Sequence, residues 1–227
     1  MSRKHQFFLL VLTLLNLCTY SQNKKVQISF NPKWKENNVV INKFYLSSNS
    51  TDSILISKMK FYVSEVSLVS DDKSILFNKS FLIDLEESNS FNLEVLEGFK
   101  IKQLFFLLGT DSITNVSGAM DGDLDPLKGM YWTWQSGFIN VKIEGTQLKS
   151  DGESDVFHLH LGGYRSPYVA NKKMKFQIEK ASNEISFYLD LDVFLETALQ
   201  KGLKNIMSPG ESALDLMEAL SKTFKLN

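Results

Sequence analysis

Cysteine is almost absent from this chain. Cys18 is the single cysteine in 227 residues, and it lies near the N-terminus. A chain with one thiol cannot form an intramolecular disulfide. Histidine is nearly as scarce, with three residues in all. The fold must therefore be stabilised by its core, and any metal site rich in nitrogen or sulfur has few residues to draw on.

Charge of one sign and the common catalytic motifs are missing too. The formal net charge is −1, and Lys and Arg form no cluster, which argues against nucleic acid as a partner. The sequence has no GxSxG, no phosphate-binding P-loop and no GxGxxG. Pairs of carboxylate residues are present, but none stands at a characteristic spacing from a further residue that could act with it in catalysis. We therefore expect a protein that is not an enzyme.

The N-terminal segment is typical of a signal peptide. A short positive stretch at residues 3–5 precedes an apolar run at residues 7–17, which is too short to span a bilayer. Thr19 and Ser21 are small residues at positions −3 and −1 of a cleavage site before Gln22. We predict a signal peptide at residues 1–21, one domain at residues 22–227, and a periplasmic or secreted monomer.

Two alternatives to cleavage are an uncleaved anchor and a lipid anchor on Cys18. Leu17 disfavours the lipid anchor, because a lipobox needs a small residue at that position. Cleavage would remove Cys18 and His5, so that His158 and His160 would be the only histidines of the mature chain. No later apolar run is long enough to cross a membrane.

Period-two alternation of apolar and polar residues predicts a mostly β fold. Turn-forming Asn, Asp, Gly and Ser separate the alternating segments, which is typical of an antiparallel β-sandwich with Greek-key-like connections. We expect strands at residues 26–30, 54–60, 61–69, 104–108, 139–143, 175–179 and 185–193.

The C-terminal part changes to helical spacing. Ala213, Leu216, Met217 and Leu220 predict an amphipathic helix that covers part of the sheet. Residues 208–211 read Ser-Pro-Gly-Glu and resemble a capping box with proline at the first helical position. Residues 193–203 are a second helix candidate.

A run of alternate aspartates is the first candidate site. Asp121, Asp123 and Asp125 stand beside Gly122 and Pro126, and Asp111 lies ten residues upstream of Asp121. Such carboxylates can bind Ca²⁺, although residue 132 is Trp where an EF-hand loop has Glu. The alternative is an ordinary turn whose Asp side chains cap backbone N–H groups.

Trp132 and Trp134 form the second candidate. In an unbroken strand through Asn140 and Lys142, both indoles would lie on the polar face, and a bulge at Gly137 would reverse this. Packing under a loop or helix is the ordinary role of such residues, and a chemical role is the alternative.

His158 and His160 are the third candidate. Residues i and i+2 of a strand share a face, so the two imidazoles should lie about 7 Å apart. Such a pair can offer two nitrogen ligands to copper or zinc. With no other histidine or cysteine in the mature chain, carboxylate, Met or a modified residue would have to complete the site. The alternative is two solvent-exposed or hydrogen-bonded histidines.

Several of these segments together resemble one family. They are GTDS at 109–112, GDLDP at 122–126, GMYWTWQSGFI at 129–139, and HLGG at 160–163. This pattern is similar to the MbnP-like copper-binding domain, and the resemblance extends over nearly the whole mature chain.

The resemblance implies an exported β-rich domain that binds copper. It also implies a dihaem MauG-like peroxidase partner that oxidises a tryptophan to kynurenine. Trp132 or Trp134 would be the modified residue, and His160 a nitrogen ligand. Many relatives have a histidine in the first strand, whereas this chain has Asn31. Either His158 substitutes for that histidine, or the copper site is absent.

Three functional hypotheses follow from the sequence. The first is a copper-binding protein in which histidine, and a kynurenine made from Trp132 or Trp134, hold the metal. The second is a metal-free structural or interaction domain on the same fold. The third is a Ca²⁺-stabilised sandwich that binds carbohydrate or protein.

Overall fold

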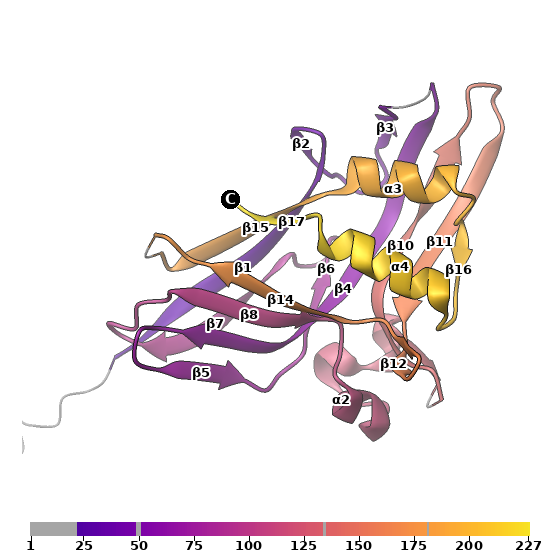
Figure 1. Cartoon of the computed structure of the whole chain (residues 1–227). Helices are drawn as coiled ribbons and strands as arrows, with labels where there is room; N and C mark the ends of the chain where they lie inside the picture. The colour runs from indigo at the N-terminus through magenta and orange to yellow at the C-terminus, as the bar shows by residue number, and fades with distance from the viewer. Residues whose placement is uncertain (1–21, 49–50, 134, 181) are drawn as a thin grey trace, which may run out of the picture.

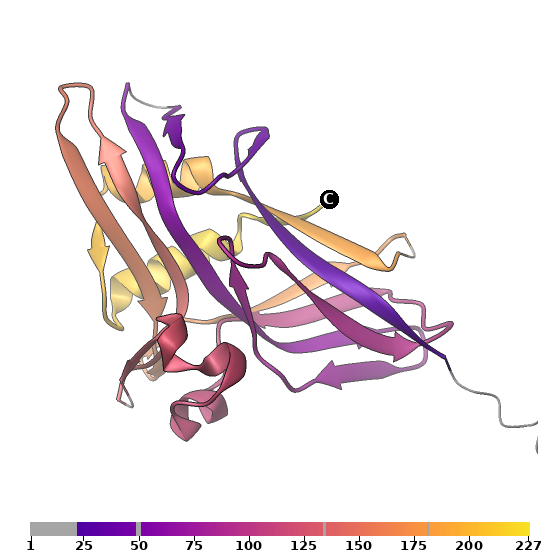
Figure 2. The same cartoon turned by 180° about the vertical axis from the view of Figure 1, so that it is seen from behind.

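Two β-sheets of unequal size organise the chain in the computed structural model, which describes residues 22–48, 51–133, 135–180 and 182–227 (Figures 1 and 2). The larger sheet has the order β14-β8-β4-β10-β11-β16, and the smaller one β17-β15-β1-β2. The predicted signal peptide at residues 1–21 lies outside the described residues.

The larger sheet and its short flanking strands are β3 (Phe44–Leu46), β4 (Ser53–Val69), β5 (Ser74–Phe77), β6 (Phe81–Asp84), β8 (Gln103–Leu108), β9 (Tyr131–Thr133), β10 (Gly137–Leu148), β11 (Ser154–Gly162), β14 (Lys172–Gln177) and β16 (Asn205–Ile206). The smaller sheet contains β1 (Asn23–Trp34), β2 (Asn37–Asn38), β7 (Ser90–Leu96), β15 (Glu184–Asp190) and β17 (Phe224–Leu226). The remaining elements are β12 (Tyr164–Arg165), β13 (Tyr168–Val169), α2 (Ser112–Ser117), the 3₁₀ turns η1 (Gly122–Leu124) and η2 (Pro126–Lys128), α3 (Leu191–Gln200) and α4 (Glu211–Ser221).

The main core lies between the two sheets. Phe30 of β1 is fully buried, and its ring centre lies 5.3 Å from those of Phe61 in β4 and Phe187 in β15, and 6.0 Å from that of Phe106 in β8. Alternation places these residues on facing surfaces, as expected for a sandwich. We call the side of the larger sheet that faces this core the inner face.

The opposite side of the larger sheet, the outer face, carries a second and smaller apolar cluster. Its fully buried members include Tyr62, Met130 and Phe138. The segment with α2, η1, η2 and β9 folds back over this end of the sheet. Further along β10 and β11 the outer face carries Lys142, Glu144, His158 and His160.

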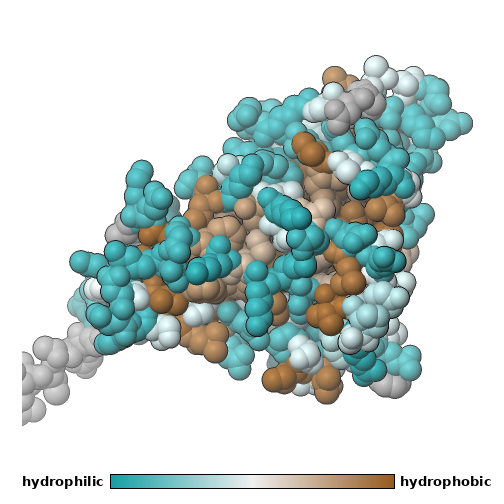
Figure 3. Space-filling model, in the orientation of Figure 1, coloured by the Kyte–Doolittle hydropathy of each residue, from teal (hydrophilic) through white to brown (hydrophobic). Residues whose placement is uncertain are grey.

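The mostly β sandwich with a C-terminal amphipathic helix is confirmed, with Ala213, Leu216, Met217 and Leu220 of α4 buried as predicted. α4 packs against β11, and α3 runs beside it (Figure 1). Viewed in the same orientation, the surface shows apolar side chains between hydrophilic ones (Figure 3).

Strand direction and length depart from the predictions. β1 and β15 pair in parallel, as do β11 and β16, so the sheets are mixed and not purely antiparallel. Pairs so distant in sequence are not constrained by a hairpin, so either direction is open to them. Residues 53–69 form a single strand, β4, where two were predicted.

The helix boundaries also differ. β15 ends at Asp190 and α3 starts at Leu191, because apolar residues from there on recur at helical spacing and are buried. The predicted capping box is wrong. α4 begins at Glu211 after Gly210, with no side-chain cap, and Pro209 instead lies against Gly163. No helix in the described ranges is long and apolar enough to cross a membrane.

Candidate metal centre

A row of polar side chains crosses the outer face of three neighbouring strands. The pairing of β10 with β11 sets Lys142 opposite His160 and Glu144 opposite His158. The pairing of β10 with β4 sets the same two residues opposite Lys60 and Lys58. Directly opposed residues share a face and have Cβ atoms about 5 Å apart. The register alone therefore gathers two imidazoles, a carboxylate and three lysines.

Glu144, His158 and His160 form the one group of three His, Asp or Glu residues in the described ranges that could hold a metal ion. The Oε1 atom of Glu144 lies 2.7 Å from Nε2 of His160 and 3.8 Å from Nδ1 of His158. The two imidazole ring centres are 6.0 Å apart. The prediction that both histidines share a face is confirmed, and Glu144 is an addition to it.

The two histidines differ in burial. His160 is 5 % exposed, whereas the side chain of His158 is 37 % exposed. A buried imidazole needs hydrogen-bond partners, because an unsatisfied buried polar atom destabilises the fold. Nε2 of His160 has Glu144, but its Nδ1 is buried without a partner. His160 therefore has one buried nitrogen still available to a ligand.

Electrostatics favour a neutral His160 beside an ionised Glu144. Burial lowers the pKa of the His160 imidazole, and the hydrogen bond to Glu144 only partly opposes this. Burial raises the pKa of the Glu144 carboxyl, but the hydrogen bond from His160 and the charge of Lys142 outweigh it and leave the pKa below its ordinary value. A neutral imidazole that donates from Nε2 carries a free lone pair on Nδ1. This arrangement is typical of metal-binding histidines.

Trp132 lies next to this cluster. A Cβ atom built on Gly162 would meet the Cζ3 atom of the indole at 2.7 Å, so the ring rests on the bare backbone of Gly162. Gly162 follows His160 by two positions in β11 and shares its face. The indole Nε1 of Trp132 is buried and has no hydrogen-bond partner. Two orphaned nitrogen atoms thus belong to neighbouring side chains.

Trp132 reaches this place by a route that the sequence did not predict. The strand is not unbroken: β9 ends at Thr133 and pairs with β10 as an antiparallel hairpin. Gly137 has a φ of 76°, and the register shifts between Gly137 and Phe138. The chain therefore folds back and lays Trp132 over the outer face. Trp134 lies outside the described residues.

The GTDS segment has a structural role. Thr110 donates from its backbone N to Oδ1 of Asn140 at 2.9 Å, and Asn115 donates to Oγ1 of Thr110 at 2.8 Å. Oδ1 of Asn115 accepts from the backbone N of Phe138 at 2.8 Å. A Cβ on Gly109 would meet the Asn140 side chain at 2.7 Å. This buried network fixes the folded-back segment on β10.

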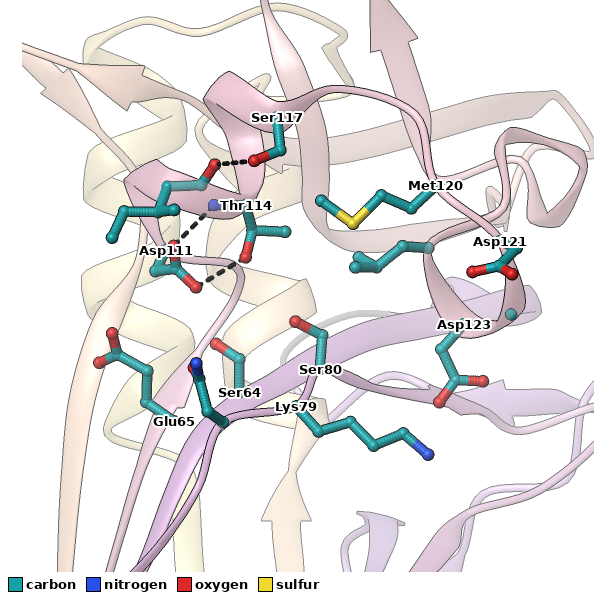
Figure 4. Close-up of a pocket in the computed structure, with 14 residues that line it drawn as sticks. Ser64, Glu65, Lys79, Ser80, Asp111, Thr114, Ser117, Met120, Asp121 and Asp123 are labelled. Atoms are coloured by element: carbon teal, nitrogen blue, oxygen red, sulfur yellow. Dashed lines mark hydrogen bonds between the residues drawn. The ribbon is translucent and has the colours of Figure 1, made fainter.

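The four aspartates do not converge on a common metal site. Asp111 caps α2 and accepts from both the backbone N and Oγ1 of Thr114 at 2.7 Å. Asp123 accepts from the backbone N of Leu82, and Asp125 from that of Leu127. The side chain of Asp121 makes no capping bond. Figure 4 shows Asp111 on one side of a cleft and Asp121 and Asp123 on the other. The bonds of Asp111, Asp123 and Asp125 to backbone N–H groups are those that the turn interpretation predicts.

Two residues of the centre were missed by the sequence analysis, Glu144 and Gly162. A signal for Glu144 exists in residues 149–153, where Asp151-Gly152 forms the turn between β10 and β11. A hairpin centred there pairs 144 with 158 and 142 with 160, as observed. No comparable signal shows that Gly162 makes room for an indole from another strand.

Asn31 lies away from this centre. It belongs to β1 in the smaller sheet and bonds to Ser186 and Asn89 at 2.9 and 3.0 Å. Its neighbour Phe30 points into the main core, so Asn31 points to the other side of its sheet. A histidine at position 31 would therefore not belong to the cluster of Glu144, His158 and His160, and the presence of Asn31 removes no ligand from that cluster.

Comparisons with known proteins agree with the fold. The MbnP family model matches residues 23–208. The structure of MbnP from Methylosinus trichosporium is similar, with a TM-score of 0.58 and 17 % sequence identity, and the match covers 77 % of this chain and 78 % of that one. At this identity the likeness extends to the fold alone. No curated protein sequence matches the chain.

Proposed function

Because the chain belongs to the MbnP family, we propose that it is an exported protein that binds copper on the outer face of its larger sheet. The observation that carries the proposal is the cluster of His160, Glu144 and His158 with Trp132 beside it. The protein acts as a binder and not as an enzyme. His160 is the central residue of the site.

The donor atoms fit copper. Imidazole nitrogen suits copper, and the cluster offers two imidazoles and one carboxylate. Two ligands of a tetrahedral ion with bonds of about 2.0 Å lie about 3.3 Å apart. The 2.7 Å contact between Glu144 and His160 is therefore a hydrogen bond that an ion would have to open. An ion bound to the free Nδ1 of His160 would keep that bond but would leave the Glu144 oxygen out of its ligand set, so we expect the unmodified protein to bind copper weakly in either arrangement.

Conversion of Trp132 to kynurenine would strengthen the site. Oxidation breaks the C2–C3 bond of the indole, adds oxygen to both carbons, and releases C2 as formate on hydrolysis. The product carries an aryl amine and a ketone where the indole had one N–H donor. These groups would lie beside His160, whose Nδ1 has no other partner. Glu144 would then hold His160 from the other side through Nε2.

The oxidant in this proposal is the peroxide-derived haem species of a dihaem MauG-like peroxidase, the partner implied by the family. Trp132 is only partly buried and lies in a segment that folds over the sheet from outside. Trp134 is the alternative position, and the experiment treats both residues alike.

The test is to purify the protein with and without a co-expressed dihaem partner and to measure its copper content and intact mass. Matured wild-type protein should show the mass of a kynurenine and stoichiometric copper, and unmatured protein much less copper. Trp132→Phe should lose both changes, and the matched variant Trp134→Phe should keep them. Full copper in both tryptophan variants would exclude the kynurenine. Absence of copper throughout would favour a metal-free interaction domain on the same fold.

Export is tested separately by N-terminal sequencing of the mature protein. We expect the first residue to be Gln22, because Thr19 and Ser21 precede it and the apolar run is short. Retention of Met1, or a lipid on Cys18, would contradict this.

A further inference from the structure

A second site candidate lies on the other side of the folded-back segment. A cleft of about 510 Å³ opens between β4, the loop before β6, and the segment with α2 and η1 (Figure 4). It shares Leu124 with the small apolar cluster of the outer face, but none of its lining residues belongs to the copper cluster. The copper proposal leaves this cleft unexplained.

The cleft is strongly acidic. Glu65, Asp111, Asp121 and Asp123 line it, and none of them forms an ion pair within the described ranges. Lys79 is the single cation of the lining, and its Nζ lies 5.1 Å from the centre of the Phe81 ring. Carboxylates without counterions repel one another, so a bound cation would stabilise them.

The hydroxyl of a largely buried serine faces the same space. Ser80 is only 8 % exposed, and its side chain makes no hydrogen bond in the described parts of the chain. Figure 4 shows this hydroxyl directed into the cleft, beside that of Ser64. A hydroxyl that has no protein partner and faces a cleft is free to donate or accept a hydrogen bond with a ligand.

Glu65 reaches the cleft through a backbone irregularity. It has a φ of 48° and lies where the pairing of β4 with β8 shifts register between Ser64 and Ser67. A β-bulge redirects a side chain, and left-handed backbone is unfavourable for a residue with a Cβ. The strained backbone of β4 is thus at Glu65, the residue of this strand whose carboxylate lines the cleft.

The ligand is larger than a metal ion. The four carboxylates are too far apart to form a metal-binding group, and both oxygens of Asp111 already bond to Thr114. The volume of about 510 Å³ exceeds that of a single ion many times over. Met120 and Leu124 provide apolar wall between the charged positions. We propose that the cleft binds an organic cation, an alkylammonium or guanidinium group on a short apolar stem.

The test is calorimetric titration of the mature full-length chain with agmatine at low ionic strength. We expect saturable binding that weakens as salt is added. Glu65→Gln and Asp121→Asn should each weaken binding about fivefold, and Ser80→Ala roughly tenfold. Asp72→Asn is the matched control, because Asp72 is an exposed carboxylate in the turn after β4, and it should bind like the wild type.

Titrations with other ligands distinguish the possible sources of the cation. If the peptide acetyl-Ala-Arg-Ala-amide binds more tightly than agmatine, the natural ligand is an arginine of a partner protein, and the reverse order indicates a free amine. His160→Ala should bind agmatine normally, so this result does not depend on copper binding. Equal binding of uncharged butylurea, preferential binding of Ca²⁺, or unchanged affinity in all three cleft variants would overturn the proposal.

Discussion

The inner and outer faces of the larger sheet are made by the same strands but differ in almost every respect. The inner face is apolar and is covered by the smaller sheet and the two C-terminal helices. The outer face carries lysines, Glu144 and both histidines of the described chain, and it is covered at one end only by the segment that holds Trp132. The alternation of β10 and β11 separates the residues that stabilise the fold from those that could bind a metal.

Buried residues of the two faces are stabilised by different interactions. On the inner face a residue is stabilised by packing alone, as Phe30 is by Phe61 and Phe187. On the outer face His160 is almost as buried but is polar, so it depends on Glu144 and leaves Nδ1 unsatisfied. Such an unsatisfied atom costs stability and is a reason to expect a ligand.

The largest expected effect is on the inner face. Phe30→Ala should lower the free energy of unfolding by about 3–5 kcal/mol, because it opens a cavity in the middle of the sandwich. Thermal unfolding should show a melting temperature roughly 10 °C lower. The matched variant Phe44→Ala removes a ring that is 49 % exposed and should have little effect. The folded Phe30→Ala protein should still bind copper. Loss of its copper would contradict the claim that the inner face stabilises the fold and the outer face alone binds the metal.

The next effect is at the contact between the outer face and the segment that covers it. Gly162→Ala places a methyl group against both the Trp132 ring and the backbone oxygen of Phe138, and should destabilise the protein by about 1–3 kcal/mol. It should also reduce kynurenine formation, because the indole must move. Gly210→Ala is the control, since a Cβ there meets nothing within 4 Å. Mass spectrometry and thermal melts measure both effects, and normal maturation of Gly162→Ala would argue against the placement of Trp132.

A smaller effect is expected from acid in the metal-free protein. The pKa of His160 is lowered from 6.5 by burial, so the unfolded state binds more protons than the folded state in the pH range between the two values. The free energy of unfolding should therefore fall as the pH drops below about 6.5 and level off below the folded-state pKa. His160→Asn should flatten this dependence more than His158→Asn does. Equal profiles in chemical denaturation would show that His160 is not buried as a neutral imidazole.

The smallest effect is expected from calcium. The side chains of Asp123 and Asp125 already accept from backbone N–H groups, and the aspartates do not converge. Exchange of Ca²⁺ for a chelator should leave the melting temperature unchanged. Stabilisation near 2.7 kcal/mol, the value for a site filled at about 100 times its dissociation constant, would restore the calcium hypothesis.

The inner face could be predicted from sequence because alternation and burial follow directly from strand geometry. The strand positions and the four buried residues of α4 are examples. The direction of β15 against β1 could not be predicted, because it is decided by contacts between segments about 155 residues apart in sequence and not by a local turn.

The candidate centre was only partly predictable for a similar reason. His158 and His160 follow from spacing within one strand, and Glu144 follows from the next strand once the Asp151-Gly152 turn is taken as the hairpin centre. The position of Trp132 depends on a chain reversal and on the absence of a side chain at Gly162. Neither leaves a periodic pattern in the sequence.

The most direct test of the central claim is the copper content of His160→Ala after co-expression with the dihaem partner, with His158→Ala as the matched variant. Both proteins should melt within a few degrees of the wild type, since neither substitution touches the inner face. We predict that His160→Ala retains little copper and that His158→Ala retains most of it, because His160 is buried between Glu144 and the position of Trp132, whereas His158 is at the exposed edge of the cluster. Full copper loading of a folded His160→Ala protein would contradict the account.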